Sequence, residues 1–123
     1  MDTIAGTLPI LLHSAYVLFD TGASFSCIAE SFAVVCVECM TEALSVNSPL
    51  GSGAVLNRIC KNVDIEIEGR HLPADLVVLD MVDFDVILGV DWLVKHHAFI
   101  NCHDLVVQFS MLDGDCFAYK IDV

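Results

Sequence analysis

The residues with the clearest chemical potential form one short segment, Tyr16-Val17-Leu18-Phe19-Asp20-Thr21-Gly22-Ala23. Apolar residues lead directly into Asp20, so we expect a buried strand that delivers this carboxylate at the edge of the core. Burying an isolated charge is costly, so an acid at this place needs a compensating role. Thr21 offers a hydroxyl for a supporting hydrogen bond, and Gly22 and Ala23 lack the bulk that would keep a ligand backbone away.

An aspartate before a glycine also has a simpler interpretation. Asp20 could start a turn and hydrogen-bond only to its own backbone, and such short motifs often occur by chance. On this segment alone the two interpretations have about equal weight. A second segment further along the chain, Phe84-Asp85-Val86-Ile87-Leu88-Gly89-Val90-Asp91-Trp92-Leu93, favours the catalytic one.

Together the two segments resemble the retropepsins: an apolar strand into Asp-Thr-Gly-Ala, a glycine-bearing hairpin, then Ile-Leu-Gly before a short helix. The closest likeness is to the peptidase domain in the polyproteins of gypsy-type LTR retrotransposons. The similar stretches are residues 19–24, 31–33, 74–79, 85–93 and 100–102. The likeness extends over about residues 3–110 of a single expected domain, residues 1–123.

The resemblance implies a role for each matching residue. Asp20 is expected to be the catalytic acid, with Thr21 and Gly22 as its support. The expected substrate-binding residues are Gly22, Ala23, Ser24, Ser52, Gly53 and Ile87, where Ser52 and Gly53 lie near the tip of a flap formed by residues 49–56. The expected structural motif behind the active loop is Ile87, Leu88, Gly89 and Asp91, and Asp91 begins the short helix that follows.

One carboxylate cannot act as acid and base at once, and the chain carries the motif once. We therefore expect a homodimeric aspartic endopeptidase that processes an extended polyprotein substrate and needs no metal or organic cofactor. Two alternatives remain open. One is a catalytically silent or host-adopted dimerisation module with the same fold, and the other is a host-adopted peptidase or a relative in the ubiquitin pathway.

Short apolar runs and period-two alternation dominate the chain, which predicts an all-β fold with one or two short helices. For a retropepsin-like chain this implies a closed barrel, one lobe per subunit. The expected strands cover residues 3–12, 15–19, 26–28, 43–47, 54–60, 63–68, 72–79, 86–88, 98–102, 105–109 and 116–121, and the expected helices cover residues 29–36 and 91–97.

The amino-acid composition argues against some classes of binding partner. Seventeen acidic residues against five Lys and Arg give a formal charge of −12, so we expect no nucleic-acid binding and no attraction to an anionic membrane. The hydrophobic fraction is 56%, which is high for a soluble monomer of 123 residues. Either the core is large for the chain, or a second copy or neighbouring polypeptide covers part of the apolar surface. Trp92, Phe99 and Phe109 are interpreted as core or dimer contacts.

The six cysteines have no secretory signal before them, so we expect reduced thiols in an intracellular protein, cytoplasmic and associated with a polyprotein or particle. Residues 3–19 carry no Asp, Glu, Lys or Arg before Asp20, but Gly6 and Pro9 interrupt them. Two strands joined by a turn fit this stretch better than a membrane span. A zinc site from Cys36, Cys39 and the later His96, His97, Cys102 and His103 is a minor alternative.

Overall fold

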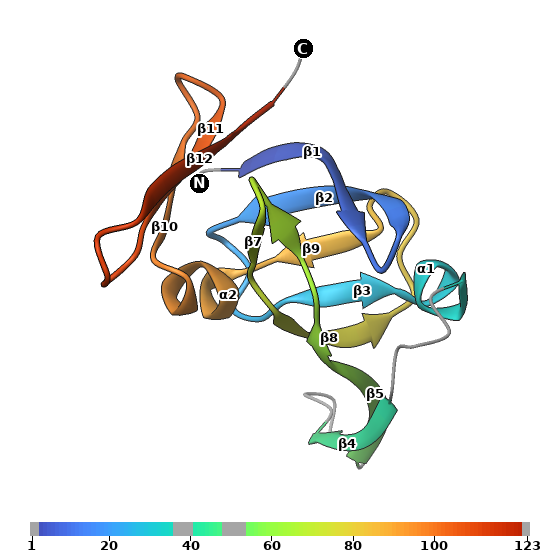
Figure 1. Cartoon of the computed structure of the whole chain (residues 1–123). Helices are drawn as coiled ribbons and strands as arrows, with labels where there is room; N and C mark the ends of the chain where they lie inside the picture. The colour runs from blue at the N-terminus through green and yellow to red at the C-terminus, as the bar shows by residue number, and fades with distance from the viewer. Residues whose placement is uncertain (1–2, 36–40, 48–53, 122–123) are drawn as a thin grey trace.

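The computed structural model describes residues 3–35, 41–47 and 54–121, and these form short strands and two short helices (Figure 1). The strands are β1 Thr3–Ile10, β2 His13–Asp20, β3 Cys27–Ala29, β4 Thr41–Asn47, β5 Ala54–Val63, β6 Glu66–Ile67, β7 Arg70–His71, β8 Ala74–Leu79, β9 Val86–Leu88, β10 Ala98–Asn101, β11 Val106–Ser110 and β12 Cys116–Lys120. The helices are α1 Glu30–Val35 and α2 Val90–Lys95. The prediction of a mainly β chain is confirmed.

The main sheet has seven strands in the order β1-β2-β9-β3-β8-β5-β4. A second sheet contains β10, β11 and β12 in sequence order, and β6 pairs with β7 in a small ribbon. In the main sheet β2 runs parallel to β9, and β3 runs parallel to β8, while the other neighbours are antiparallel. The centre of this sheet is therefore built from strands that are distant in sequence.

The expected closed barrel is not found among the described strands. The main sheet is open, with β1 and β4 at its two edges, and the backbone pairing between β1 and the β6 region is an isolated bridge between Ile10 and Ile65. The pairing of β5 with β8 shifts register between Cys60 and Val63, and such a bulge bends the strand. The chain beyond the bulge reaches β1 at this bridge but does not form a continuous ladder with it.

The strand expected over residues 63–68 is divided, because β5 ends at Val63 and β6 covers only Glu66–Ile67. Glu68, directly after β6, has a positive φ of 51°, which ends the extended conformation there. The alternation of faces nevertheless holds, because Val63, Ile65 and Ile67 are buried whereas the intervening acidic residues are exposed. Hydrophobic alternation therefore predicted the buried face correctly but not the length of the strand.

The first hairpin is regular except at its turn. β1 pairs with β2 from Thr3 opposite Asp20 to Ile10 opposite His13, so residues 3–19 form two strands joined by a turn, as expected. The turn residues Leu11 and Leu12 both have positive φ, at 50° and 67°. Bulky side chains rarely adopt this conformation, and Leu12 is also fully exposed.

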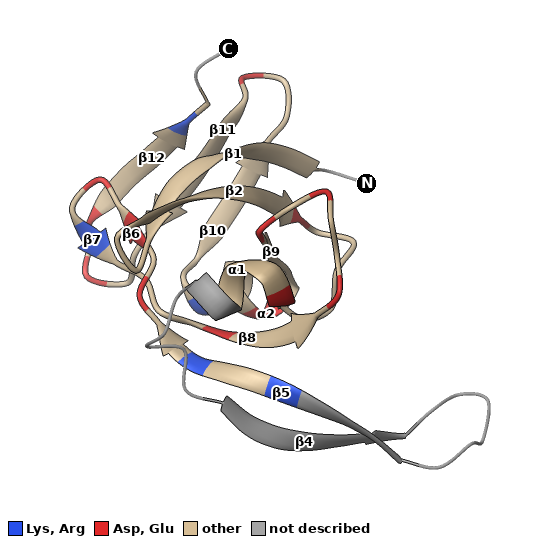
Figure 2. Ribbon diagram, turned by 90° about the vertical axis from the view of Figure 1, so that its right-hand side faces the viewer, with Lys and Arg blue, Asp and Glu red and all other residues tan. Residues whose placement is uncertain are grey.

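Charged side chains are unevenly distributed: acidic residues occupy many turns, while the basic residues on β5, β7 and β12 are separated from one another (Figure 2). Arg70 on β7 donates two hydrogen bonds to the carboxylate of Asp115, at 2.9 and 2.7 Å, and this lowers the pKa of Asp115. Its guanidinium also lies 4.3 Å from the ring centre of Phe117 on β12. These contacts fasten the β6–β7 ribbon to the second sheet.

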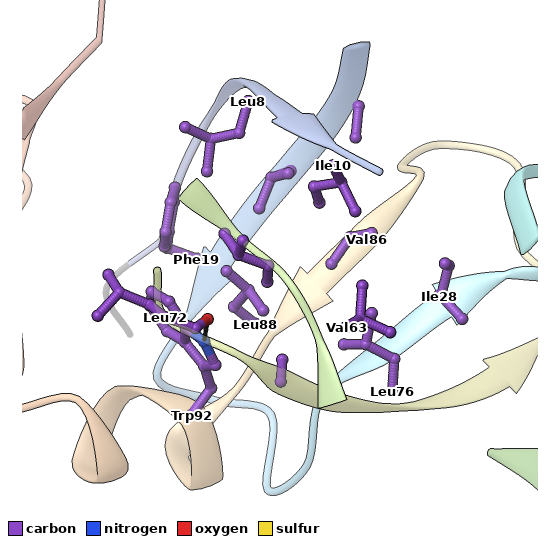
Figure 3. Close-up of a cluster of buried hydrophobic side chains, with 14 of the residues drawn as sticks. Leu8, Ile10, Phe19, Ile28, Val63, Leu72, Leu76, Val86, Leu88 and Trp92 are labelled. Atoms are coloured by element: carbon purple, nitrogen blue, oxygen red, sulfur yellow. Dashed lines mark hydrogen bonds between the residues drawn. The ribbon is translucent and has the colours of Figure 1, made fainter. Parts of the chain in front are cut away.

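The core lies between the main sheet, α2 and the second sheet, and its largest buried side chains are Trp92, Phe19 and Phe109. Figure 3 shows Phe19 and Trp92 within this cluster. The Trp92 indole N–H donates to the carbonyl of Leu72 at 3.0 Å, so its polar atom is satisfied inside the core. Trp92 and Phe109 are core residues, as expected. Phe99 is 63% exposed and does not belong to the core, because its side chain lies on the outward face of β10.

The cysteines differ in state. Cys27, Cys102 and Cys116 are free thiols, whereas Cys60 is disulfide-bonded. The expectation of reduced cysteines is therefore wrong at Cys60. Stable disulfides are uncommon in reducing compartments, so the Cys60 disulfide does not support the predicted intracellular location. That location stays a prediction. Among the described helices, none is long and apolar enough to cross a membrane.

Candidate active site

The carboxylate of Asp20 lies at the end of β2, which is buried on one face and has Tyr16 exposed on the other. β2 runs parallel to β9, with Phe19 opposite Leu88, and both of these side chains are fully buried. Parallel neighbours end at the same edge of a sheet, so the loop after Asp20 and the loop after Leu88 emerge side by side. Asp20 itself is half-buried, which leaves its carboxylate at the boundary between the core and solvent.

The residues after Asp20 turn sharply. The Gly22 N–H donates to the Asp20 carboxylate oxygen Oδ1 at 2.7 Å, and the Ala23 N–H donates to the Asp20 carbonyl at 3.2 Å. Thr21, Gly22 and Ser24 are exposed, and Ala23 is partly buried. This is the geometry of an aspartate that opens a turn, and it also fixes the direction of a carboxylate that faces solvent.

The loop of residues 20–26, here called the Asp20 loop, packs directly on the start of α2. The Val90 N–H donates to the Ala23 carbonyl at 2.8 Å. Gly89 is buried against the same loop, and a Cβ at this position would lie 2.6 Å from the Ala23 carbonyl oxygen and 2.8 Å from that of Phe25. Only glycine therefore allows the two backbones to approach this closely.

A second set of contacts joins Ser26, Gly89 and Asp91, and we call this set the Ser26–Asp91 clasp. The Ser26 hydroxyl donates to Asp91 Oδ1 at 2.6 Å and accepts the Gly89 N–H at 2.9 Å. The Ser26 N–H donates to Asp91 Oδ2 at 3.1 Å, and the Trp92 N–H donates to Asp91 Oδ1 at 2.6 Å. Ser26 is 1% exposed, so these bonds replace water at a buried hydroxyl.

Sequence reasoning missed Ser26, which it assigned only to a strand. The available signal was a small polar residue between Phe25 and Cys27 at the start of an apolar run. A hydroxyl entering the core needs a partner, but nothing in the local sequence names Asp91 as that partner. Asp91 is the second residue of α2, close to its predicted place at the beginning of the helix.

The other expected site residues divide into two groups. Leu88 is fully buried, and Ile87 lies in the middle of the main sheet, paired with Leu18 on β2 and with Cys27 on β3. Ser52 and Gly53 lie outside the described residues, as does most of the expected flap. The strands that flank this segment, β4 and β5, pair from Thr41 opposite Cys60 to Asn47 opposite Ala54 (Figure 1).

Other reactive groups nearby have structural explanations. Burial raises the pKa of the Cys27 thiol, which disfavours the reactive thiolate. His96 is buried against Trp92, and its Nε2 donates to the Pro73 carbonyl at 2.8 Å. In the part of the chain that the structure describes, no three His, Cys, Asp or Glu side chains are placed to hold a metal ion. Cys36 and Cys39 lie outside that part.

Comparison with known proteins places this geometry in a family. Residues 1–115 match the family model of the retroviral aspartyl proteases. DNA damage-inducible protein 1 from Candida glabrata is 34% identical over 61 residues, and its counterpart from Saccharomyces cerevisiae is 31% identical over 61 residues. Each alignment covers 50% of this chain but only 14% of the yeast protein, so the chain corresponds to a small part of these relatives.

Solved structures show the same fold. The retroviral protease-like domain of Ddi1 from Leishmania major superposes with a TM-score of 0.67 at 17% identity, covering 89% of this chain and 85% of that domain. The EIAV protease, solved with the inhibitor HBY-793, superposes with a TM-score of 0.60 at 22% identity, covering 81% of this chain and 93% of the protease. The fold is thus retropepsin-like, and the chain belongs to the retroviral aspartyl protease family.

Proposed function

We propose that this chain is one subunit of an aspartic endopeptidase in which Asp20 is the catalytic residue. The observation that carries the proposal is the place of Asp20, a half-buried carboxylate at the end of β2, whose inward-facing Val17 and Phe19 are fully buried. Its direction is fixed by the Gly22 N–H, and its loop is fastened to Gly89 and Asp91. Membership of the retroviral aspartyl protease family supports a catalytic role over a simple turn.

A second copy of the chain would complete the site. Members of the retropepsin family act as dimers, and each copy of this chain provides one Asp20 motif. Apolar side chains lie exposed in and beyond the Asp20 loop: Phe25 is 51% exposed, Val94 on α2 is 68% exposed and Phe99 on β10 is 63% exposed. Covering such side chains removes apolar surface from water, which favours association of two copies.

In such a dimer the two Asp20 carboxyls would share one proton, because like charges about 3 Å apart cannot both ionise easily. The ionised carboxylate would take a proton from a water molecule that attacks the peptide carbonyl. The protonated partner would donate its proton to the carbonyl oxygen, and a proton would later pass to the leaving amine. Gly22 and Ala23 would border the substrate backbone, and the Thr21 hydroxyl would make the contacts between subunits that brace the paired loops.

The proposed substrate is an extended peptide segment, such as a cleavage site in a polyprotein. Strand-like substrates can pair with exposed backbone, and residues 49–56, most of which lie outside the described part of the chain, are the proposed flap. The motifs at residues 19–24 and 85–93 support a gypsy-type retrotransposon origin, while the yeast matches equally allow a host gene. The scattered basic residues in Figure 2 give no basic face among the described residues, so nucleic acid is not a proposed partner.

The test is cleavage of a peptide library at mildly acid pH, with and without pepstatin. Asp20→Asn should abolish cleavage and retain the wild-type melting temperature, because it preserves the shape of the carboxyl group. Asp83→Asn, which changes an exposed aspartate elsewhere, should cleave normally. Activity should rise more steeply than protein concentration while monomers remain. Full pepstatin-sensitive cleavage by Asp20→Ala would overturn the assignment, and a stable dimer without cleavage would indicate a silent module.

A further inference from the structure

We propose that Asp91 is a positioning residue for catalysis, acting through Ser26 to hold the Asp20 loop in its working shape. The inference rests on the proposed function, since it concerns the same carboxylate. Asp91 does not contact Asp20; it acts at the opposite end of the loop. Its role is to restrict a loop whose first residue carries the chemistry.

The contacts of the Asp91 side chain are directed at the Asp20 loop. Two of its three hydrogen bonds come from Ser26, one from the hydroxyl at 2.6 Å and one from the backbone N–H at 3.1 Å. Ser26 and Asp91 are 65 positions apart in sequence, so these bonds join two segments that only the fold brings together. The third bond, from the Trp92 N–H at 2.6 Å, ties the same carboxylate to the buried tryptophan.

A continuous path of backbone bonds leads from this clasp to the catalytic carboxylate. The Ser26 hydroxyl accepts the Gly89 N–H, and the next residue, Val90, donates its N–H to the Ala23 carbonyl at 2.8 Å. Ala23 in turn donates to the Asp20 carbonyl, and the neighbouring Gly22 N–H holds Asp20 Oδ1 at 2.7 Å. A shift of α2 relative to the loop would therefore change the direction of the Asp20 carboxylate.

The chemistry of the clasp requires these residue types. Both oxygens of Asp91 act as acceptors, which a carboxylate can do and an amide cannot, because one of the two atoms of an amide is a donor. In Asp91→Asn, the amide nitrogen would face a Ser26 donor or the Trp92 N–H. The Ser26 hydroxyl both donates and accepts, so Ser26→Ala leaves the Gly89 N–H without its partner and leaves Asp91 Oδ1 with the Trp92 N–H alone.

A general stabilising role would give a different pattern from a positioning role. A variant that only loosens the fold loses active protein in proportion to the unfolded fraction, and the remaining folded molecules keep their kcat. A variant that misplaces the Asp20 carboxylate lowers kcat in fully folded protein, since catalysis depends on alignment within about 1 Å. Substrate binding by the rest of the cleft is retained, so KM changes little.

The experiment compares Asp91→Asn, Ser26→Ala and their double variant with wild type, below the melting temperature of each protein. We expect kcat to fall about 10- to 100-fold in each single variant with KM within about twofold. The double variant should lose about as much as one single variant, because both changes break the same contacts. Ser26→Thr, which keeps the hydroxyl and adds a methyl beside a cavity of about 130 Å³, should recover most of the activity.

Asp75→Asn is the matched control. Asp75 is exposed, lines the same cavity and accepts one backbone N–H, from Asn62 at 2.8 Å, but it has no bond to the Asp20 loop. It should keep the wild-type kcat. Unchanged kcat in folded Asp91→Asn, or equal losses in Asp75→Asn and Asp91→Asn, would overturn the inference while leaving the proposed function intact.

Amide hydrogen exchange gives a readout that does not require activity. In Asp91→Asn the amides of Gly22, Ala23 and Val90 should exchange at least about tenfold faster than in wild type, while those of β11 stay unchanged. If wild type fails to cleave any peptide, the proposed function is wrong, and exchange alone then decides whether the clasp holds the loop. Unchanged exchange at these amides would contradict the inference in either case.

Discussion

A methyl group added at Gly89 should displace the Asp20 loop. In Gly89→Ala the new Cβ would lie 2.6 Å from the Ala23 carbonyl oxygen, whereas ordinary contact begins at 3.4 Å, so this backbone must move by about 0.8 Å. Overpacking of this kind costs about 1–3 kcal/mol. Losing the Val90–Ala23 hydrogen bond adds about 1 kcal/mol. The free energy of unfolding should therefore fall by about 2–4 kcal/mol in total, which lowers the melting temperature by about 10 °C.

The displacement should affect catalysis more than folding. Asp20 lies three residues before Ala23, and a shift of nearly 1 Å in the loop should reduce kcat about 100-fold in protein that calorimetry shows to be folded. Gly114→Ala is the control, because Gly114 has a positive φ of 93° but no atom within 4 Å of the new Cβ. It should lose about 1 kcal/mol through backbone strain and keep its kcat. A Gly89→Ala protein with wild-type melting temperature and kcat would refute the close packing of this loop on α2.

Two further predictions concern stability. Leu12→Gly should raise the free energy of unfolding, measured in urea, by about 0.5–1 kcal/mol, because the relief of a positive φ exceeds the entropy cost of glycine. Leu112 is also highly exposed but does not have a positive φ, so Leu112→Gly should lower the free energy of unfolding. Burial lowers the pKa of His96, so the folded protein favours the neutral ring. The associated stability is present above the unfolded pKa of about 6.5 and is lost as pH falls from there towards the folded pKa. His96→Gln retains a donor for the Pro73 carbonyl, so its melting temperature should fall less on acidification than that of wild type. His103→Gln, at an exposed position, should behave like wild type. An equal fall in His96→Gln and wild type would contradict the role assigned to His96.

Local pattern predicted the faces of strands better than their ends. The alternation of Val63, Ile65 and Ile67 with acidic residues correctly identified the inward side chains. It could not show that the strand breaks, because the positive φ at Glu68 is imposed by the turn and not favoured by the residue type. The Leu11–Leu12 turn is a similar case, since leucine gives no turn signal and the pairing of β1 with β2 forces the conformation.

In the candidate site, too, the features that depend on neighbouring residues could be predicted, whereas contacts between distant segments could not. Asp20 could be singled out because apolar residues before it and small residues after it are adjacent in sequence. The bonds between Ser26 and Asp91 could not be predicted, because they depend on β2 and β9 lying parallel and ending at the same edge. The open main sheet was also missed, since hydrophobic alternation identifies the buried face of a strand but not the strands with which it pairs.

In the proposed dimer each chain contributes one catalytic carboxyl, so an inactive chain also inactivates the intact chain with which it pairs. If wild-type and Asp20→Asn chains were expressed in equal amounts and paired at random, only about a quarter of the pairs would carry two intact carboxyls. One defective gene would then halve the output of a normal one, because half of the intact chains would be held in mixed pairs. A single polypeptide with both acids would not behave in this way, so the proposed half-site predicts dominant inheritance of inactivating changes.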